Sequence, residues 1–136
     1  MSTPAANSSS HSKVIVSTPH APAAIGPYSQ AVSYGGLVYC SGQIALDPTT
    51  MEIVGEDAAA QARQVMSNLG EVLKAAGSDF SKVLKCSIFL DSMDDFAAVN
   101  EVYGAYFPEE PPARETVAVQ TLPKHVLVEI SCVAAL

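Results

Sequence analysis

The segment 126–135, close to the C-terminus, restricts the possible folds more than any other part of the chain. Side chains of a β-strand point alternately to its two faces. Here both alternating sets are apolar: one contains Val126, Val128 and Ile130, and the other contains Leu127, Val133 and Ala135. A strand of this kind is buried on both faces. The fold must therefore cover both faces of the sheet that holds this strand.

The rest of the chain predicts one domain of alternating strands and helices. A length of 136 residues is enough for one stable core without a metal or a disulfide. Residues 1–12 are rich in Ser, Ala and Pro and predict a flexible tail, which leaves a domain at 13–136. We expect a helix from about Asp57 to Ala76, ended by Gly77, and a second one that is capped by Asp91 or Ser92 and stops before Pro108. Strands are expected at 14–16, 28–34, 37–44, 83–91, 114–121 and 126–135.

Two local patterns sharpen this prediction. Gly35-Gly36 separates two β-rich runs and is a typical two-residue hairpin turn. The strand at 83–91 alternates, and we expect one apolar face on it, made of Leu84, Cys86, Ile88 and Leu90.

The predicted order, β-β-β-α-β-α-β-β, indicates an α+β fold. Right-handed crossovers place both helices on one face of a single mixed sheet. No segment remains to cover the other face, so the simplest cover is identical subunits, and we expect a homo-oligomer. Charged residues are only 15% of the chain, against roughly 25% in an average soluble domain, which agrees with an extensive subunit interface.

Composition disfavours several classes of protein. The net charge of -7, from 14 acids and 7 bases, provides no basic stripe for nucleic acid. No apolar run has the length of a membrane span, and the start lacks a secretory core, so no membrane partner is expected. Cys40, Cys86 and Cys132 lie far apart in apolar runs and are expected to be reduced core residues. The histidines have no partners at ligand spacing, so no metal site is expected.

Arg114 is the first candidate for chemistry. It is one of two arginines in the chain and follows the rigid segment Pro111-Pro112-Ala113 at the start of a predicted strand. There its planar guanidinium can bind a carboxylate with two parallel hydrogen bonds. The alternative is a structural salt bridge at the end of a strand.

Glu129 is the second candidate, because it interrupts the apolar last strand between Val128 and Ile130. An ionised carboxylate in such a place is costly unless it is paired or hydrogen-bonded. Two explanations remain open: Glu129 pairs with Arg114 or caps a subunit interface, or it orients and deprotonates a water molecule.

Weaker candidates lie near the hairpin and on the second helix. Tyr28 and Ser41 carry hydroxyl groups, and Gly42 lets another group approach the backbone closely. Tyr28 can donate to a ligand oxygen or simply fill the second face of the sheet. Asn100 can contact a ligand or bond a nearby loop.

Taken together, six short motifs resemble the RidA (YjgF) family of reactive intermediate deaminases. The similarity extends from Val14 to Leu136 and so includes nearly everything except the tail. The motifs are AAIGPYSQA at 23–31, SGQI at 41–44, FAAVN at 96–100, PAR at 112–114, LPK at 122–124 and VEI at 128–130.

The resemblance implies a chorismate-mutase-like fold and a homotrimer with ligand clefts between neighbouring subunits. It also implies hydrolysis of 2-imino acids, such as 2-iminobutanoate and 2-iminopropanoate, to 2-keto acids and ammonia. Arg114 matches the residue that binds the carboxylate, and Glu129 matches the acid that places the attacking water. Other cleft positions are matched by Tyr28, Ser41, Gly42, Asn100 and Thr116. No cofactor is expected, because an iminium carbon is electrophilic enough for water to attack it directly.

Three residues depart from the pattern of this family. Glu115 follows the arginine where a small residue is usual; it points to the opposite face of the strand, but its charge can still weaken anion binding. Thr116 stands where some members have Cys, which excludes thiol chemistry there. Met51 replaces a usual glycine in the turn before Ile53 and is expected to change the shape of that loop.

Two other functions remain alternatives. A ribonuclease, translation inhibitor or chaperone has been described in this family, but a nuclease needs clustered basic residues, and the five lysines here are scattered. A regulatory protein that binds a keto acid without catalysis would use the same Arg114. The acid-free, Ser-rich start resembles a mitochondrial transit peptide but has no arginine, so the cytoplasm is the favoured compartment.

Overall fold

A computed structural model describes residues 12–136 of the chain. The prediction of a flexible tail falls almost wholly on residues 1–11, outside this range. The described part forms one six-stranded sheet with the strand order β1-β2-β3-β6-β4-β5. Its strands are β1 (Val14–Val16), β2 (Ala31–Tyr34), β3 (Leu37–Gln43), β4 (Val83–Leu90), β5 (Ala113–Ala118) and β6 (Val128–Ala135).

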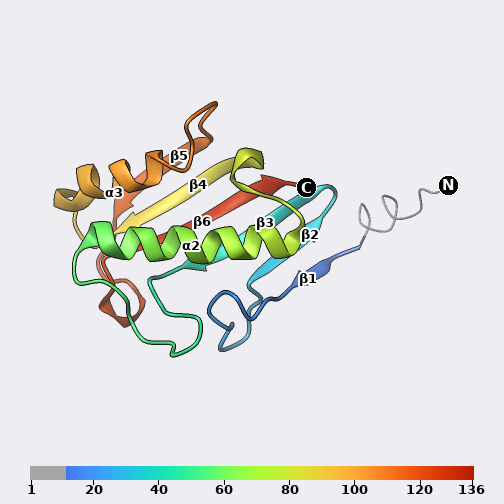
Figure 1. Cartoon of the computed structure of the whole chain (residues 1–136), viewed down its shortest axis with the longest axis horizontal. Helices are drawn as coiled ribbons and strands as arrows, with labels where there is room; N and C mark the ends of the chain where they lie inside the picture. The colour runs from blue at the N-terminus through green and yellow to red at the C-terminus, as the bar shows by residue number, and fades with distance from the viewer. Residues whose placement is uncertain (1–11) are drawn as a thin grey trace.

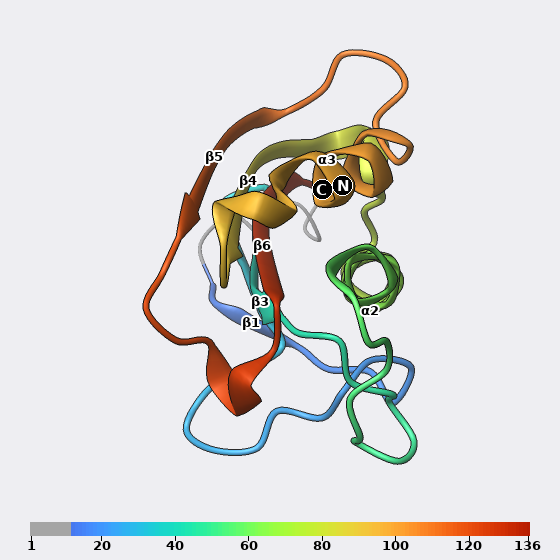
Figure 2. The ribbon, with the colours of Figure 1, turned by 90° about the vertical axis from the view of Figure 1, so that its left-hand side faces the viewer.

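Two α-helices, α2 (Ala58–Ala76) and α3 (Phe96–Gly104), lie on the same face of the sheet (Figures 1 and 2). The strands β4 and β5 are parallel, and the other neighbouring pairs are antiparallel. Short 3-10 turns lie at Phe80–Lys82, Met93–Asp95 and Pro123–His125. The predicted element order, mixed sheet and single helical layer are confirmed, and no described helix has the length and apolar character needed to cross a membrane.

Local sequence explains the best-defined boundaries. Gly35 and Gly36 have φ angles of 64° and 84°, which β-carbon-bearing residues adopt at a cost, and they close the hairpin between β2 and β3. The Asp57 side chain accepts a hydrogen bond from the Ala60 N–H at 2.8 Å and so caps α2. Gly77 ends α2 in the left-handed conformation, with φ 88°.

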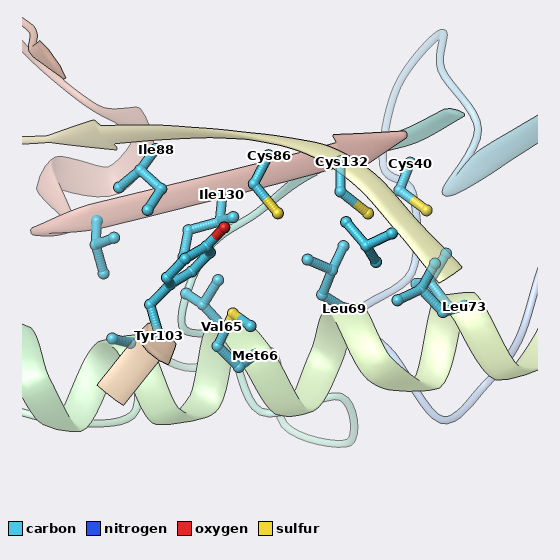
Figure 3. Close-up of a cluster of buried hydrophobic side chains, with 14 of the residues drawn as sticks. Cys40, Val65, Met66, Leu69, Leu73, Cys86, Ile88, Tyr103, Ile130 and Cys132 are labelled. Carbon is cyan, nitrogen blue, oxygen red and sulfur yellow. The ribbon is translucent and has the colours of Figure 1, made fainter. Parts of the chain in front are cut away.

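The core lies between the sheet and the two helices. From α2 it receives Val65, Met66, Leu69, Val72 and Leu73, all fully buried. On the sheet side, Cys40, Cys132 and Cys86 oppose one another across β3, β6 and β4, and Figure 3 shows the three sulfur atoms in one row above α2. All three are free and buried, as predicted.

One predicted core position is wrong. Leu84 is 50% exposed, whereas Val83 is 6% exposed and faces the core. The cause is an irregularity in the pairing of β4 with β6 between Val83 and Lys85, because one extra residue reverses the faces of the residues before it. From Cys86 onward the predicted alternation holds.

No helix or further strand of residues 12–136 covers the face of the sheet opposite the helices (Figure 2). Along β6, alternate residues from Val128 to Ala134 are buried, while those from Glu129 to Ala135 are only partly buried. Large apolar side chains on neighbouring strands of this open face, Ile15, Tyr39 and Val117, are 45% to 54% exposed. Within residues 12–136 the last strand is therefore buried on one face only, and the subunit cover expected for its second face stays a prediction.

Candidate functional site

The residues that the sequence singled out fall into two groups on opposite faces of the sheet. In the register of β4, Cys86 pairs with Arg114 and Phe89 pairs with Glu129. Cys86 faces the core, and Phe89, an odd number of positions away, faces the open side. Arg114 consequently lies on the helix side of the sheet and Glu129 on the open side. Pairing of Glu129 with Arg114 inside one chain, one of the two explanations offered above, is excluded by this geometry.

The first group, here called the arginine half-site, consists of Arg114, Asn100 and Thr116. The Arg114 guanidinium donates from Nη1 to the Asn100 side-chain oxygen at 2.6 Å. The same guanidinium lies 5.2 Å from the centre of the Tyr103 ring and 5.6 Å from that of Phe96, distances at which aromatic rings attract cations. Arg114 is nevertheless exposed, so the free edge of the guanidinium remains available to a carboxylate.

Two hydroxyl groups lie at the arginine half-site, that of Thr116 and that of the adjacent Tyr103. The Thr116 hydroxyl is buried but has no hydrogen-bond partner within the described chain, and a buried polar atom without a partner is costly. The Tyr103 hydroxyl points toward the Cys86 thiol (Figure 3), and burial raises the pKa of this phenol well above its ordinary value. Tyr103 therefore stays neutral beside the Arg114 cation.

The second group, here called the glutamate half-site, consists of Tyr28, Ser41, Gly42 and Glu129. All four line one cavity of about 590 Å³. The Ser41 hydroxyl donates to the Ser29 carbonyl at 2.6 Å, which fixes the loop that carries Tyr28. Tyr28 is 54% exposed and lies at the cavity with its ring free to meet a ligand.

Gly42 and Glu129 are in direct contact. A β-carbon at position 42 would lie 2.8 Å from the carboxyl carbon of Glu129 and would overlap one of its oxygens. Only glycine therefore leaves room for the Glu129 side chain. Burial raises the pKa of this carboxyl above its usual value of 4.5, because desolvation disfavours the charged form. A carboxylate of this kind is suited to accept a proton.

Three buried amides brace the loops around the cavity, and the sequence analysis did not select them. Gln30 donates from Nε2 to the Pro22 and Thr18 carbonyls at 2.8 and 3.0 Å. Asn68 donates to the Ile44 and Leu46 carbonyls at 3.2 and 3.0 Å. Gln61 donates to the Gly55 carbonyl at 3.1 Å and accepts from the Leu127 N–H at 2.8 Å. The only sequence signal for the last two was a polar residue at a helical position that should face the core.

The structure also shows where the residues that depart from the family pattern lie. Glu115 lies on the open face, where it forms an ion pair with Lys85 at 3.2 Å and a hydrogen bond with Ser87. These contacts lower the pKa of Glu115, with the Ser87 bond as the largest cause. Its charge is thus balanced on the face opposite Arg114.

Met51 has φ 63°, in the left-handed region that favours glycine. Within residues 12–136, no group of three His, Cys, Asp or Glu side chains is arranged to hold a metal ion.

The fold and these two half-sites define the class of the protein. It is a small α+β domain with one helical layer, one open sheet face and an exposed arginine, held by Asn100, on the face opposite a partly buried acid. Residues 18–136 match the family model described as Endoribonuclease L-PSP. The chain belongs to this family, which includes the RidA proteins.

Relatives and solved structures agree with this assignment. The 2-iminobutanoate/2-iminopropanoate deaminase of Mus musculus is 48% identical over 88% of this chain and 89% of its own. Reactive Intermediate Deaminase A, chloroplastic, of Arabidopsis thaliana is 48% identical over 96% of this chain and 70% of its own. The structure of RidA from an Antarctic Psychrobacter has a TM-score of 0.87 at 44% identity and matches 90% of this chain and 99% of its own. The structure of E. coli TdcF with bound serine has a TM-score of 0.86 at 40% identity, over 90% and 98% of the two chains.

Proposed function

We propose that the protein hydrolyses 2-imino acids, such as 2-iminobutanoate and 2-iminopropanoate, to 2-keto acids and ammonia. The reaction takes place in clefts between the subunits of a homotrimer, where the arginine half-site of one subunit meets the glutamate half-site of the next. The observation that carries this proposal is the placement of Arg114 and Glu129 on opposite faces of a sheet whose open face is apolar. Support also comes from the relatives named as imine deaminases.

Arg114 holds and aims the substrate in this mechanism. Its guanidinium is already oriented by Asn100, Tyr103 and Phe96, so little side-chain entropy is lost when it binds the substrate carboxylate. The Thr116 hydroxyl, which has no hydrogen-bond partner among residues 12–136, is available to hydrogen-bond the same ligand. Fixing the carboxylate places the adjacent imine carbon at a defined position.

Glu129 activates the water. Its carboxylate accepts a hydrogen bond from a water molecule and takes a proton as the water oxygen bonds to the imine carbon. The product of this step is a tetrahedral carbinolamine. Because the substrate reacts as the protonated iminium, the nitrogen of this intermediate is neutral. Glu129 then returns its proton to the nitrogen, the carbon–nitrogen bond breaks, and the hydroxyl proton passes to the departing ammonia, which leaves as ammonium as the carbonyl of the 2-keto acid forms. No cofactor takes part in these steps.

The alternative is a regulatory protein that binds keto acids without catalysis. The deciding measurement is ammonia release from freshly generated 2-iminobutanoate. The proposed enzyme accelerates this release above the rate in buffer, whereas a sensor binds 2-ketobutanoate without any acceleration. A nuclease is disfavoured by the net charge of -7.

A subunit-mixing experiment tests the shared cleft. Arg114→Ala and Glu129→Gln each leave every cleft of their own trimer incomplete. In a 1:1 mixture that has exchanged subunits, about a quarter of the clefts combine an intact Arg114 with an intact Glu129, so about a quarter of the wild-type activity should return. A mixture that stays as inactive as its components, with exchange verified by mass-labelled subunits, would show that the two residues do not act across an interface.

A further inference from the structure

The cavity of the glutamate half-site is bordered by two residues in an unusual backbone conformation. Among the described residues, four non-glycine residues have positive φ, and two of these, Met51 at 63° and Lys124 at 55°, line this one cavity. The left-handed conformation costs free energy for any residue with a β-carbon. Such residues persist where the surrounding structure holds them, and they cluster at ligand-binding sites.

The turn that carries Met51 is tightly held. The Met51 N–H donates to the Asp47 carbonyl at 2.8 Å. The Asp47 carboxylate accepts from the Thr49 and Thr50 N–H groups at 2.8 and 3.0 Å. Met51 is therefore held at the cavity by its own turn and contributes a flexible, apolar side chain there.

The cavity has a polar end and an apolar end. Gly42 and Glu129, in contact with each other, mark the polar end. The chain continues from Gly42 to Leu46, which pairs with Ile53 across the turn of Met51. The apolar end is therefore built by the segment beyond Gly42, with the loop before Tyr28 as its other wall. The apolar residues of the cavity lining are Pro22, Ala23, Ile25, Ile44, Leu46, Met51 and Pro123, and the polar residues Gln30, Gln43 and Lys124 line it as well.

In one isolated chain the cavity is larger than a small imino acid needs, and in the proposed trimer the arginine half-site of the neighbouring subunit borders the same space. 2-Iminobutanoate has seven non-hydrogen atoms. If each of them is given ~30 Å³, the volume of one water molecule in the liquid, the whole molecule occupies roughly 210 Å³. The cavity measures about 590 Å³. In the proposed mechanism the substrate carboxylate lies at Arg114 of the neighbouring subunit, so the part of the substrate that extends into this cavity is its side chain.

We propose that the apolar end binds the substrate's side chain and that Met51 is a specificity residue. On this proposal, which rests on the proposed deaminase function, the preferred substrates are 2-imino acids with apolar side chains of about four carbons. Such a side chain reaches from the imine carbon near Glu129 into contact with Met51. Each further methylene group buried against apolar atoms strengthens binding several-fold.

The test compares two imines in the wild-type protein and in Met51 variants. The imines of leucine and of 2-aminobutanoate are generated in situ by an amino-acid oxidase with catalase, and keto-acid formation is corrected for hydrolysis in buffer. The wild type should have a kcat/KM about tenfold higher for the leucine-derived imine than for 2-iminobutanoate. Met51→Gly, which removes the side chain and relieves the backbone, should lower this ratio about 5- to 10-fold.

Two controls separate specificity from loop shape. Met51→Leu keeps apolar bulk and should keep most of the preference, while Met93→Ala removes an exposed methionine outside the cavity and should leave both rates unchanged. Equal losses on both imines in Met51→Gly would show that Met51 only shapes the turn and would overturn the inference. A wild type that hydrolyses both imines equally well would also overturn it, yet leave the deaminase function intact. Hydrolysis of neither imine above the buffer rate would instead refute the proposed function.

Discussion

The two half-sites are made rigid in different ways. In the arginine half-site, the functional side chain itself is held, by the hydrogen bond to Asn100 and by two aromatic rings. In the glutamate half-site, Glu129 is constrained mainly by a close contact with Gly42, and buried amides hold the loops around it. A binding group gains from an orientation set before the ligand arrives, whereas a proton acceptor needs a partly desolvated place with defined walls. The predictions below test this difference from the largest effect to the smallest.

Removing the guanidinium should have the largest effect. Arg114→Ala should lower the deaminase kcat/KM by at least ~100-fold, or roughly 3 kcal/mol, because the substrate loses its charged hydrogen-bond partner. Arg114→Lys keeps the charge but loses the two parallel hydrogen bonds, so its activity should fall between the alanine variant and the wild type. Both variants should fold, since Arg114 is exposed. A lower Tm with normal turnover in the folded protein would instead assign Arg114 to a structural ion pair.

Adding one methyl group to the glutamate half-site should come next. Gly42→Ala should displace the Glu129 carboxyl and lower kcat about 30-fold, because an error near 1 Å at a reacting group can cost about 100-fold. The protein should remain folded, since the overlap is with the end of a side chain. In Glu129→Gln, which slows turnover by itself, the added Gly42→Ala should cost little more. Full additivity of the two losses would place the effect of Gly42 elsewhere.

Loosening the guanidinium should have a smaller effect than removing it. Asn100→Ala removes the acceptor for Arg114 but leaves both aromatic rings in place. The expected result is a rise in KM of about 5- to 10-fold with a smaller change in kcat, because binding depends on the orientation of Arg114. Glu101→Ala, an exposed change one residue further along α3, is the matched control. An equal effect of both variants on KM would point to the helix rather than to the hydrogen bond.

The smallest effect concerns the pH dependence of stability. Folding raises the pKa of Glu129 above the value of 4.5 that it has in the unfolded chain. At pH values between the unfolded-state pKa and the folded-state pKa, the folded chain therefore binds more protons than the unfolded chain. Stability due to this group therefore falls as the pH rises through that window, and the loss is complete above it. Glu129→Gln should raise the Tm by about 1–3 °C at neutral pH and have no effect below pH 4. A variant with a lower Tm at pH 7 would show that the carboxylate stabilises the fold.

Local sequence was sufficient for elements whose determinants lie within a few residues. The hairpin at Gly35-Gly36 and the ends of α2 depend on glycine conformations and on one capping aspartate. Leu84 was misplaced because the irregularity in β4 depends on its pairing with β6, which is far away in the sequence. The motifs identified Arg114 and Glu129 together, but their opposite faces follow only from the position of β4 between β5 and β6. Gln61 and Asn68 were missed because a polar residue on a helix is more often exposed to solvent.

The row of three cysteines allows local opening between α2 and the centre of the sheet to be measured by thiol labelling. Cys40, Cys132 and Cys86 lie buried on three adjacent strands that pack against α2, and burial raises the pKa of the Cys86 thiol. Thiol reagents attack the thiolate, so labelling must await the moments when α2 separates from the sheet. The labelling rate thus measures the free energy of that local opening. Two strands of the row, β3 and β6, carry Ser41, Gly42 and Glu129, and the third, β4, pairs with the strand of Arg114. The labelling rate can therefore also be followed in the presence of a keto acid to see whether a ligand tightens the sheet.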